Sequence, residues 1–328
     1  MSRPQTEVLI LGHGLLGRLL AWRLHQAGIG VRWFDPHPEK AAAHVAAAML
    51  APLAEGVLCP PRLVAMGRHC LVLWRQWLAE LGGVPFGLDG SLVLSHPQDR
   101  GLMSDFQARL PQGQWQPAQV AELEPALAGA FHQGLWLQEE GYLDNAALMA
   151  RLAEETAHLE TDAPELAADW VLDCRGLHAA LPGLRGVRGE VARLHAPEVA
   201  LSRPVRLLHP RYPLYVVPRP NGRYVVGATE LESRDDGPVT VRSALELLSA
   251  AYSLHPGFGE ARVESLQSGL RPALPHNEPR IRTDGNRLHI GGLYRHGYLL
   301  APALVEATLA HLFDQPPQGQ IFPWLWEQ

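Results

Sequence analysis

The sequence predicts an α/β fold in which helices cover a parallel sheet, with a second α+β domain built on an antiparallel sheet. Three observations support this prediction: a strand, a glycine-rich turn and a helix near the N-terminus; isolated apolar strands later in the chain; and a strand pair joined by a hairpin turn. The chain has 328 residues, which is more than one hydrophobic core usually serves, so two domains are expected.

The first element is a short apolar run at Glu7–Leu11, typical of a buried parallel strand. It is followed by the motif GHGLLG at Gly12–Gly17 and by a helix over Arg18–Gln26. A second strand at Gly30–Phe34 ends at Asp35, an acid at the spacing that a dinucleotide-binding unit requires.

Each part of this unit has a physical task. Gly12 permits the tight turn, Gly14 lets the backbone approach a pyrophosphate, and Gly17 lets the helix pack close to the strand. The start of the helix, at Leu15 and Leu16, offers free N–H groups to the phosphates. Asp35, followed by Pro36, can accept hydrogen bonds from ribose hydroxyls. The sequence therefore predicts a Rossmann-like unit for NAD or FAD, and the acid argues against a 2′-phosphate.

A run of small residues, ending at Pro52, comes next. The members that we expect near a ligand are His44, Ala46, Ala47, Ala48 and Met49. Small side chains at the start of a helix permit close approach of a flat or charged ligand. The alternative interpretation of the run is a plain alanine-rich helix.

The rest of the chain gives shorter signals. A helix is expected over Leu143–Ala157. Asn221-Gly222 predicts a hairpin that joins strands at Leu214–Pro218 and Arg223–Gly227. Further elements are predicted as strands at 90–94, 134–137, 170–173 and 288–292, a short strand at 158–160, a turn at 294–297 and a helix from Tyr298 onward.

Composition excludes several classes of protein. The 28 basic residues comprise Lys40 and 27 arginines, the net charge is -6, and no basic run suggests a nucleic-acid partner. Lys40 lies in no motif for Schiff-base or P-loop chemistry. The three cysteines form no disulfide framework and no zinc pattern, so we expect no metal. We find no signal-peptide layout and no apolar run long enough to span a membrane, which predicts a cytoplasmic protein.

The motifs GHGLLG, FDPHP and AAAMLAP together resemble the FAD-dependent D-amino-acid oxidase superfamily, most nearly the glycine oxidases of thiamine biosynthesis. The resemblance extends from about Glu7 to His311. Its later anchors are VLDCRG at 171–176, YVVPR at 215–219, VGAT at 226–229, SGLRP at 268–272 and GGLYRHGYLLAP at 291–302.

The resemblance implies specific roles. Arg271 would pair with the carboxylate of a substrate through its guanidinium fork, Tyr215 would donate to the same carboxylate, and Arg295 would stand at the same site. The flavin would lie near the small-residue run and near a last group of residues: Gly176, Arg295, His296, Gly297, Tyr298 and Leu299. No cysteine follows Cys174, so noncovalent FAD is expected.

The implied reaction is oxidative deamination of a small amino acid, most nearly glycine, to an imine and then an oxo acid and ammonia. O2 would be reduced to H2O2, and the motifs identify no side-chain general base. Three alternatives stay open. They are a quinone-linked dehydrogenase of D-amino acids or a sarcosine-type amine oxidase, a tRNA-modifying amine oxidase, and a non-catalytic flavoprotein-like module. The chain is also compatible with a homo-oligomer.

The resemblance implies that each domain is split along the chain. The FAD-binding domain would comprise 1–85, 142–186 and 265–328, and the substrate domain 86–141 and 187–264. The stretch between Ala157 and Trp170 is shorter than is usual in the family and would lack a hairpin that contacts the adenine side of FAD. Ala48 stands where glycine is common in the family, and His44 where a small hydroxyl residue is common.

Overall fold

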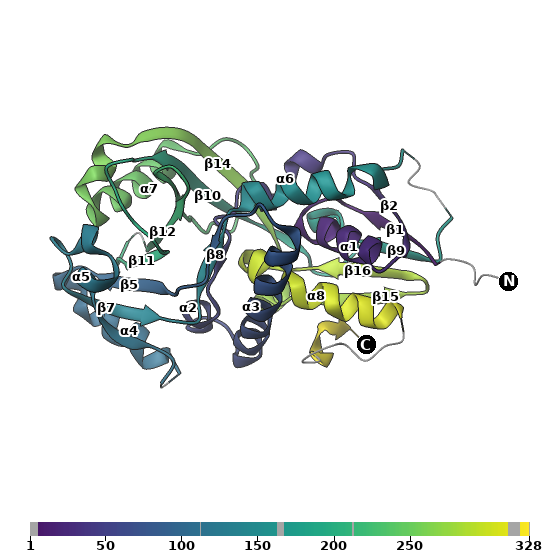
Figure 1. Ribbon diagram of the computed structural model, residues 1–328, viewed down its shortest axis with the longest axis horizontal. Helices are drawn as coiled ribbons and strands as arrows, with labels where there is room; N and C mark the ends of the chain where they lie inside the picture. Colours follow the sequence, from purple (N-terminus) through teal and green to yellow (C-terminus); the bar gives the residue numbers. More distant parts are fainter. Residues whose placement is uncertain (1–5, 112, 163–166, 212, 314–321, 328) are drawn as a thin grey trace.

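The computed structural model describes residues 6–111, 113–162, 167–211, 213–313 and 322–327. Its strands form three sheets. Figure 1 shows the two large sheets at opposite ends of the molecule, with the long helix α3 (Pro61–Leu81) between them. No helix among these residues is long and apolar enough to cross a membrane.

The six-stranded sheet is the predicted Rossmann-like unit. Its central strands β16, β9, β1 and β2 run parallel, and β15 pairs antiparallel with β16. In spatial order the strands are β17 (Trp326–Glu327), β15 (Arg280–Asp284), β16 (Arg287–Gly291), β9 (Trp170–Asp173), β1 (Glu7–Leu11) and β2 (Gly30–Phe34). Helices α1 (Leu15–Gln26), α6 (Asn145–Thr156) and α8 (Gly297–Leu312) pack together beside this sheet (Figure 1).

The eight-stranded sheet is antiparallel except where β11 runs parallel to β5. In spatial order its strands are β14 (Arg262–Ala273), β10 (Arg185–His195), β13 (Arg223–Gly227), β12 (Leu214–Arg219), β11 (Val205–Leu208), β5 (Ser91–Ser95), β7 (Gln133–Leu137) and β6 (Gln116–Gln119). The turn between β12 and β13 has positive φ at Asn221 (62°) and Gly222 (67°), as the predicted hairpin requires. The α/β fold with a second, antiparallel sheet is therefore confirmed.

A third, small sheet and further helices complete the described structure. The small sheet has the order β3 (Met49–Leu50), β8 (Gly141–Leu143) and β4 (Phe86–Gly87). The other helices are α2 (Pro52–Gly56), α4 (Arg100–Arg109), α5 (Val120–Leu123) and α7 (Val241–Leu254). One hydrophobic core lies around the parallel sheet with α1, α3, α6 and α8, and a second lies between the large sheet and α7.

Two local predictions need correction. The small-residue run is not a helix: a 3-10 turn at Ala42–His44 is followed by irregular backbone and then by β3, and Ala48 has a φ of 51°. The short strand expected at 158–160 is reduced to one parallel bridge between Glu160 and Trp33, because Ala157–Leu159 forms a 3-10 turn instead. Residues 163–166 of this shortened stretch lie outside the described residues.

The predicted division into two domains stays a prediction, but one strand bears on its boundary. Residues 265–273 belong to β14, which pairs along its whole length with β10 of the eight-stranded sheet. The sequence assigns those nine residues to the FAD-binding part. By sheet membership they belong with the antiparallel part.

Candidate active site

The glycine-rich turn after β1 is so tightly packed that two of its glycines can carry no side chain. Gly12 has a φ of 95°, and a Cβ there would lie 2.7 Å from the carbonyl oxygen of Cys174. A Cβ on Gly17 would lie 1.9 Å from the carbonyl oxygen of Gly12. The loop after β9 therefore packs against the turn, and α1 approaches β1 closely, as the motif predicts.

Gly14 differs, because the packing of the protein does not require a glycine there. Its φ is -74°, and the nearest atom to a Cβ would be that of Ala41 at 3.4 Å. Gly14 is the N-cap of α1, and no described side chain caps this helix. The free N–H groups at Leu15 and Leu16, together with a glycine that the packing does not require, are what an approaching pyrophosphate needs.

Asp35 holds this turn from the end of β2. Its Oδ2 accepts a hydrogen bond from the backbone N–H of His13 at 2.7 Å, and its Oδ1 accepts one from the N–H of His37 at 2.9 Å. Each carboxylate oxygen can accept more than one hydrogen bond, so Asp35 keeps capacity for ribose hydroxyls. Pro36, which follows, is exposed.

Two buried polar side chains at this turn, His13 and Arg18, were not predicted from the sequence as functional residues. The ring of His13 stacks on Trp33 with centroids 3.6 Å apart, and its Nε2 lies 2.9 Å from the hydroxyl of Thr156. Arg18 donates from Nε to the carbonyl oxygen of His13 and from Nη1 to that of Met149. Burial and then the charge of Arg18 lower the pKa of His13 to about 3, so this histidine is neutral at neutral pH.

Replacing His13 with glutamine should flatten the dependence of folding stability on pH. The unfolded chain takes up a proton on this histidine near pH 6.5, but the folded protein does so only near pH 3. The free energy of unfolding should therefore fall as the pH drops below 6.5, by about 1.4 kcal/mol per pH unit from this one group. Urea unfolding at pH 6.5 and 5.0 measures the difference between variant and wild type. The exposed His132→Gln serves as control, and a wild-type pH dependence in His13→Gln would contradict the assignment.

The segment 43–47 is held in place by side chains that donate hydrogen bonds to its backbone carbonyl oxygens. Arg193 of β10 donates to His44 at 2.8 Å, and Arg219 of β12 donates to Ala47 at 2.7 Å. Asn145 donates to the carbonyls of Ala43 and His44, each at 3.1 Å. These donors replace the hydrogen bonds of a helix, which is why an alanine-rich run stays irregular.

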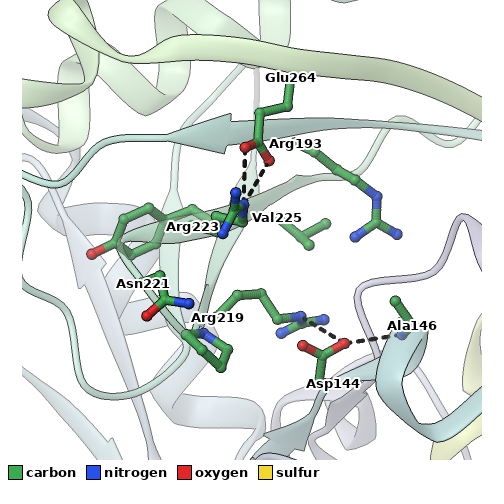
Figure 2. Close-up of a pocket in the computed structure, with 10 residues that line it drawn as sticks. Asp144, Ala146, Arg193, Arg219, Asn221, Arg223, Val225 and Glu264 are labelled. Carbon is green, nitrogen blue, oxygen red and sulfur yellow. Dashed lines mark hydrogen bonds and ion pairs between the residues drawn. The ribbon is translucent and has the colours of Figure 1, made fainter. Parts of the chain in front are cut away.

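The two arginines also line a pocket of about 210 Å³ at the start of α6. Figure 2 shows Arg193 and Arg219 extending from the large sheet toward Asp144 and Ala146. Burial lowers the pKa of Arg219 to about 10 although Asp144 opposes the shift, so Arg219 keeps its charge at neutral pH. Through the hydrogen bonds of Arg193 to His44 and of Arg219 to Ala47, the pocket lies next to the segment that the resemblance assigns to the flavin.

The side chain of Tyr215, a residue of β12, extends over Gly227 of the neighbouring strand β13 on one face of the eight-stranded sheet. Tyr215 pairs with Gly227, and a Cβ on Gly227 would lie 3.0 Å from the Tyr215 hydroxyl and 2.9 Å from Val191 of β10. Val191 and Tyr215 belong to one apolar cluster with Ala47 and Met49. The predicted substrate residue and the predicted flavin segment therefore meet on this face.

Arg271 lies on the same face. A Cβ on Gly189 would lie 2.3 Å from the guanidinium carbon of Arg271, and Gly189 is two residues from Val191 on β10, so both positions face the same side. The guanidinium donates to the carbonyl oxygens of Arg188 (3.3 Å) and Thr229 (3.0 Å). The structure thus brings Arg271 and Tyr215 together beside segment 45–49, and their role in holding a substrate stays a prediction.

Arg295 is also close by, but its charge is already paired. Its Nε lies 2.7 Å from Oε2 of Glu55, and its Nη1 lies 3.0 Å from Oε2 of Glu230. Glu55 is shared, since its Oε1 accepts from Arg206 at 2.8 Å. Glu55, Arg206 and Glu230 were not predicted from the sequence, and no motif in the sequence singles them out.

The charges of this cluster are fixed near neutral pH. Burial opposes ionisation of Glu55, but Arg295 and Arg206 outweigh it and lower the pKa of Glu55 to about 2. Burial lowers the pKa of His296 to about 4, so His296 is neutral; its Nε2 lies 3.3 Å from Sγ of Cys59. Burial also raises the pKa of Tyr215, which keeps the hydroxyl protonated and able to donate.

The last group of predicted residues lies at the start of α8 and after β9. Gly297 begins α8, and no described side chain caps this helix. The hydroxyl of Tyr298 donates to the carbonyl oxygen of Ala43 at 2.9 Å, which ties the helix to the small-residue run. Leu299 packs against α3 at Gly67. Gly176, with a φ of 59°, begins a 3-10 turn in the loop that packs on the glycine-rich turn.

These residues fit a dinucleotide cofactor. Position 14 is a glycine although the packing of the protein does not require one there. The N-terminus of α1 offers uncapped N–H groups, and Asp35 stands at the end of β2. The hydrogen bond from Tyr298 to Ala43 joins the start of α8 to the chain just before the irregular segment 45–48. The described residues contain no cluster of side chains suited to a metal ion.

Comparison with known proteins gives consistent matches along nearly the whole chain. Residues 7–310 match the family model described as "FAD dependent oxidoreductase" (DAO). The chain is 41% identical to the "Putative thiamine biosynthesis oxidoreductase ThiO" of Rhizobium etli over 96% of this chain and 98% of that protein. Among solved structures, glycine oxidase from Geobacillus kaustophilus has 21% identity and a TM-score of 0.80, with 98% of each chain covered. Iminodiacetate oxidase from a Chelativorans species has 20% identity and a TM-score of 0.79, covering 96% of this chain and 97% of that one.

Proposed function

The chain belongs to the family of FAD-dependent oxidoreductases, with FAD as its cofactor, and we propose that it oxidises the Cα–N bond of a small amino acid, with glycine as the first candidate. The observation that carries the proposal is the meeting of Arg271 and Tyr215 with segment 45–49 on one face of the large sheet. An arginine and a tyrosine that could together bind a carboxylate, beside the segment expected to contact the flavin, support an amino-acid substrate. The names of the relatives, one a glycine oxidase, support the same choice.

Each residue has a role that its chemistry supports. Gly14 and the N-terminus of α1 would hold the pyrophosphate of FAD, and Asp35 would accept hydrogen bonds from the ribose. The N–H groups at the start of α8 would stabilise the negative charge that develops on the flavin ring when it is reduced. When bound, FAD supplies the acceptor for a hydride and passes the electrons on to oxygen.

The substrate would be held by its carboxylate. The guanidinium of Arg271 would donate to one side of the carboxylate and the protonated hydroxyl of Tyr215 to the other, which orients the Cα–H bond toward the cofactor. The products would be the oxo acid and ammonia after hydrolysis of the imine, with H2O2 from O2. We assign no side chain as a general base.

Anaerobic mixing of the FAD-loaded protein with glycine tests the proposal. We expect the visible absorbance of the flavin to bleach, because the substrate loses two electrons that no oxygen is present to accept. Admitting air should restore the absorbance and yield one H2O2 per substrate oxidised. Sarcosine and D-alanine form the comparison set. Bleaching without peroxide would indicate a dehydrogenase, and no bleaching with any of the three would refute the amino-acid oxidase.

A further inference from the structure

Arg295 forms ion pairs with two carboxylates of the protein itself, Glu55 and Glu230. Glu55 comes from α2, and Glu230 follows β13 in the segment that bridges back to Arg188. The thiol of Cys59, three residues beyond α2, interacts electrostatically with Arg295 and lies 3.3 Å from Nε2 of His296. The guanidinium therefore has partners from two separate segments of the chain, and a ligand would have to displace one of them.

The two carboxylates differ in how easily a ligand could displace them. The side chain of Glu55 is 19% exposed and is also held by Arg206. That of Glu230 is 48% exposed and interacts with Arg295 and with the hydroxyl of Tyr294. Glu230 is thus the more exposed of the two partners of Arg295, and it is the one that an incoming carboxylate of a ligand would meet.

Charge balance follows from these contacts. Glu55 and Glu230 together neutralise Arg206 and Arg295. Arg271, by contrast, makes no ion pair with any carboxylate in the part of the chain that the structure describes; its hydrogen bonds go to backbone carbonyls. One uncompensated guanidinium can hold one carboxylate.

We propose that Glu230 is a specificity-determining residue whose carboxylate takes the place on Arg295 that a second carboxylate of a substrate would otherwise take. The site accordingly takes amino acids with a single carboxylate and rejects dicarboxylic amines and amino acids, which would bring a second negative charge against Glu230. This inference rests on the proposed function, in that Arg271 holds the first carboxylate.

Calorimetric titration of the FAD-loaded protein with acetate and with malonate tests the role of Glu230. The two ligands differ by one carboxylate, and neither needs turnover to be detected. We expect wild type to bind acetate more tightly than malonate. In Glu230→Gln the affinity for malonate should rise roughly tenfold, because the second carboxylate gains Arg295, while that for acetate changes little.

Three further variants control the measurement. Glu230→Asp keeps the charge and should retain the wild-type preference, and Glu230→Ser provides a second neutral variant if the glutamine variant fails to fold. Glu232→Gln removes a nearby exposed acid that pairs with Arg185 instead, and it should leave both affinities unchanged.

The outcomes separate the two proposals. Acetate binding with an unchanged malonate-to-acetate ratio in both neutral variants overturns the role of Glu230 alone. The role of Glu230 is also overturned if the wild-type protein binds malonate as tightly as acetate. If acetate fails to bind wild type, or binds equally well in Arg271→Lys, the carboxylate site of the proposed function is overturned as well.

Discussion

Replacing Arg271 with lysine should raise the KM for glycine by roughly 10- to 100-fold, with a smaller effect on kcat. Lysine keeps the positive charge but loses the planar fork that donates two parallel hydrogen bonds to one carboxylate. A hydrogen bond to a charged group is worth about 1.5–3 kcal/mol, which corresponds to that range of affinity. Steady-state kinetics with glycine at saturating oxygen measures the change.

The matched control for this variant is Arg223→Lys. Arg223 lies on β13 of the same sheet, but its side chain is 49% exposed and pairs with Glu264. The control should have the KM of wild type, and thermal unfolding should show that both variants fold. An unchanged KM in Arg271→Lys would refute the assignment of Arg271 to the substrate carboxylate.

Two alanine substitutions in the glycine-rich turn should affect different properties: Gly17→Ala the stability of the fold, and Gly14→Ala the affinity for FAD. Gly17→Ala should destabilise the protein by several kcal/mol or prevent folding, because its Cβ would lie 1.9 Å from a backbone oxygen that cannot move independently. Gly14→Ala should cost the apoprotein at most about 1 kcal/mol, since its Cβ meets only Ala41 at 3.4 Å.

The affinity for FAD should nevertheless fall in Gly14→Ala, by roughly tenfold or more, because the methyl group occupies the approach of the pyrophosphate. Thermal unfolding of the apoprotein and titration of FAD by flavin fluorescence measure the two effects separately. Wild-type FAD affinity in a folded Gly14→Ala would contradict the position of the pyrophosphate.

The parallel strands β1 and β2 and the hairpin of the antiparallel sheet could be predicted because their signals are local. β1 and β2 are short apolar runs that end at Gly12 and Asp35, and the turn between β12 and β13 carries Asn221-Gly222, whose backbone conformation follows from the residue types. The conformation of segment 45–48 could not be predicted. Alanine favours a helix, and only distant side chains such as Arg193 and Arg219 draw the carbonyls away from one.

The same contrast holds for the candidate site. Arg271 could be singled out from 27 arginines because GLRP belongs to a recognisable set of motifs. Glu55 and Glu230 could not, because they are 2 of 34 acids and are 175 residues apart in sequence. Only the fold brings them to the same guanidinium. The resemblance implied a place for Arg295 at the site, but it did not show that the charge of Arg295 is already paired.

The measurement that tests the proposed function most directly is the anaerobic mixing of FAD-loaded wild type with glycine, followed by stopped-flow absorbance. We expect full bleaching of the visible flavin absorbance in wild type, and bleaching in Arg271→Lys that needs a far higher glycine concentration. Flavin absorbance that stays unchanged at saturating glycine, sarcosine and D-alanine would contradict the proposal that this chain oxidises small amino acids.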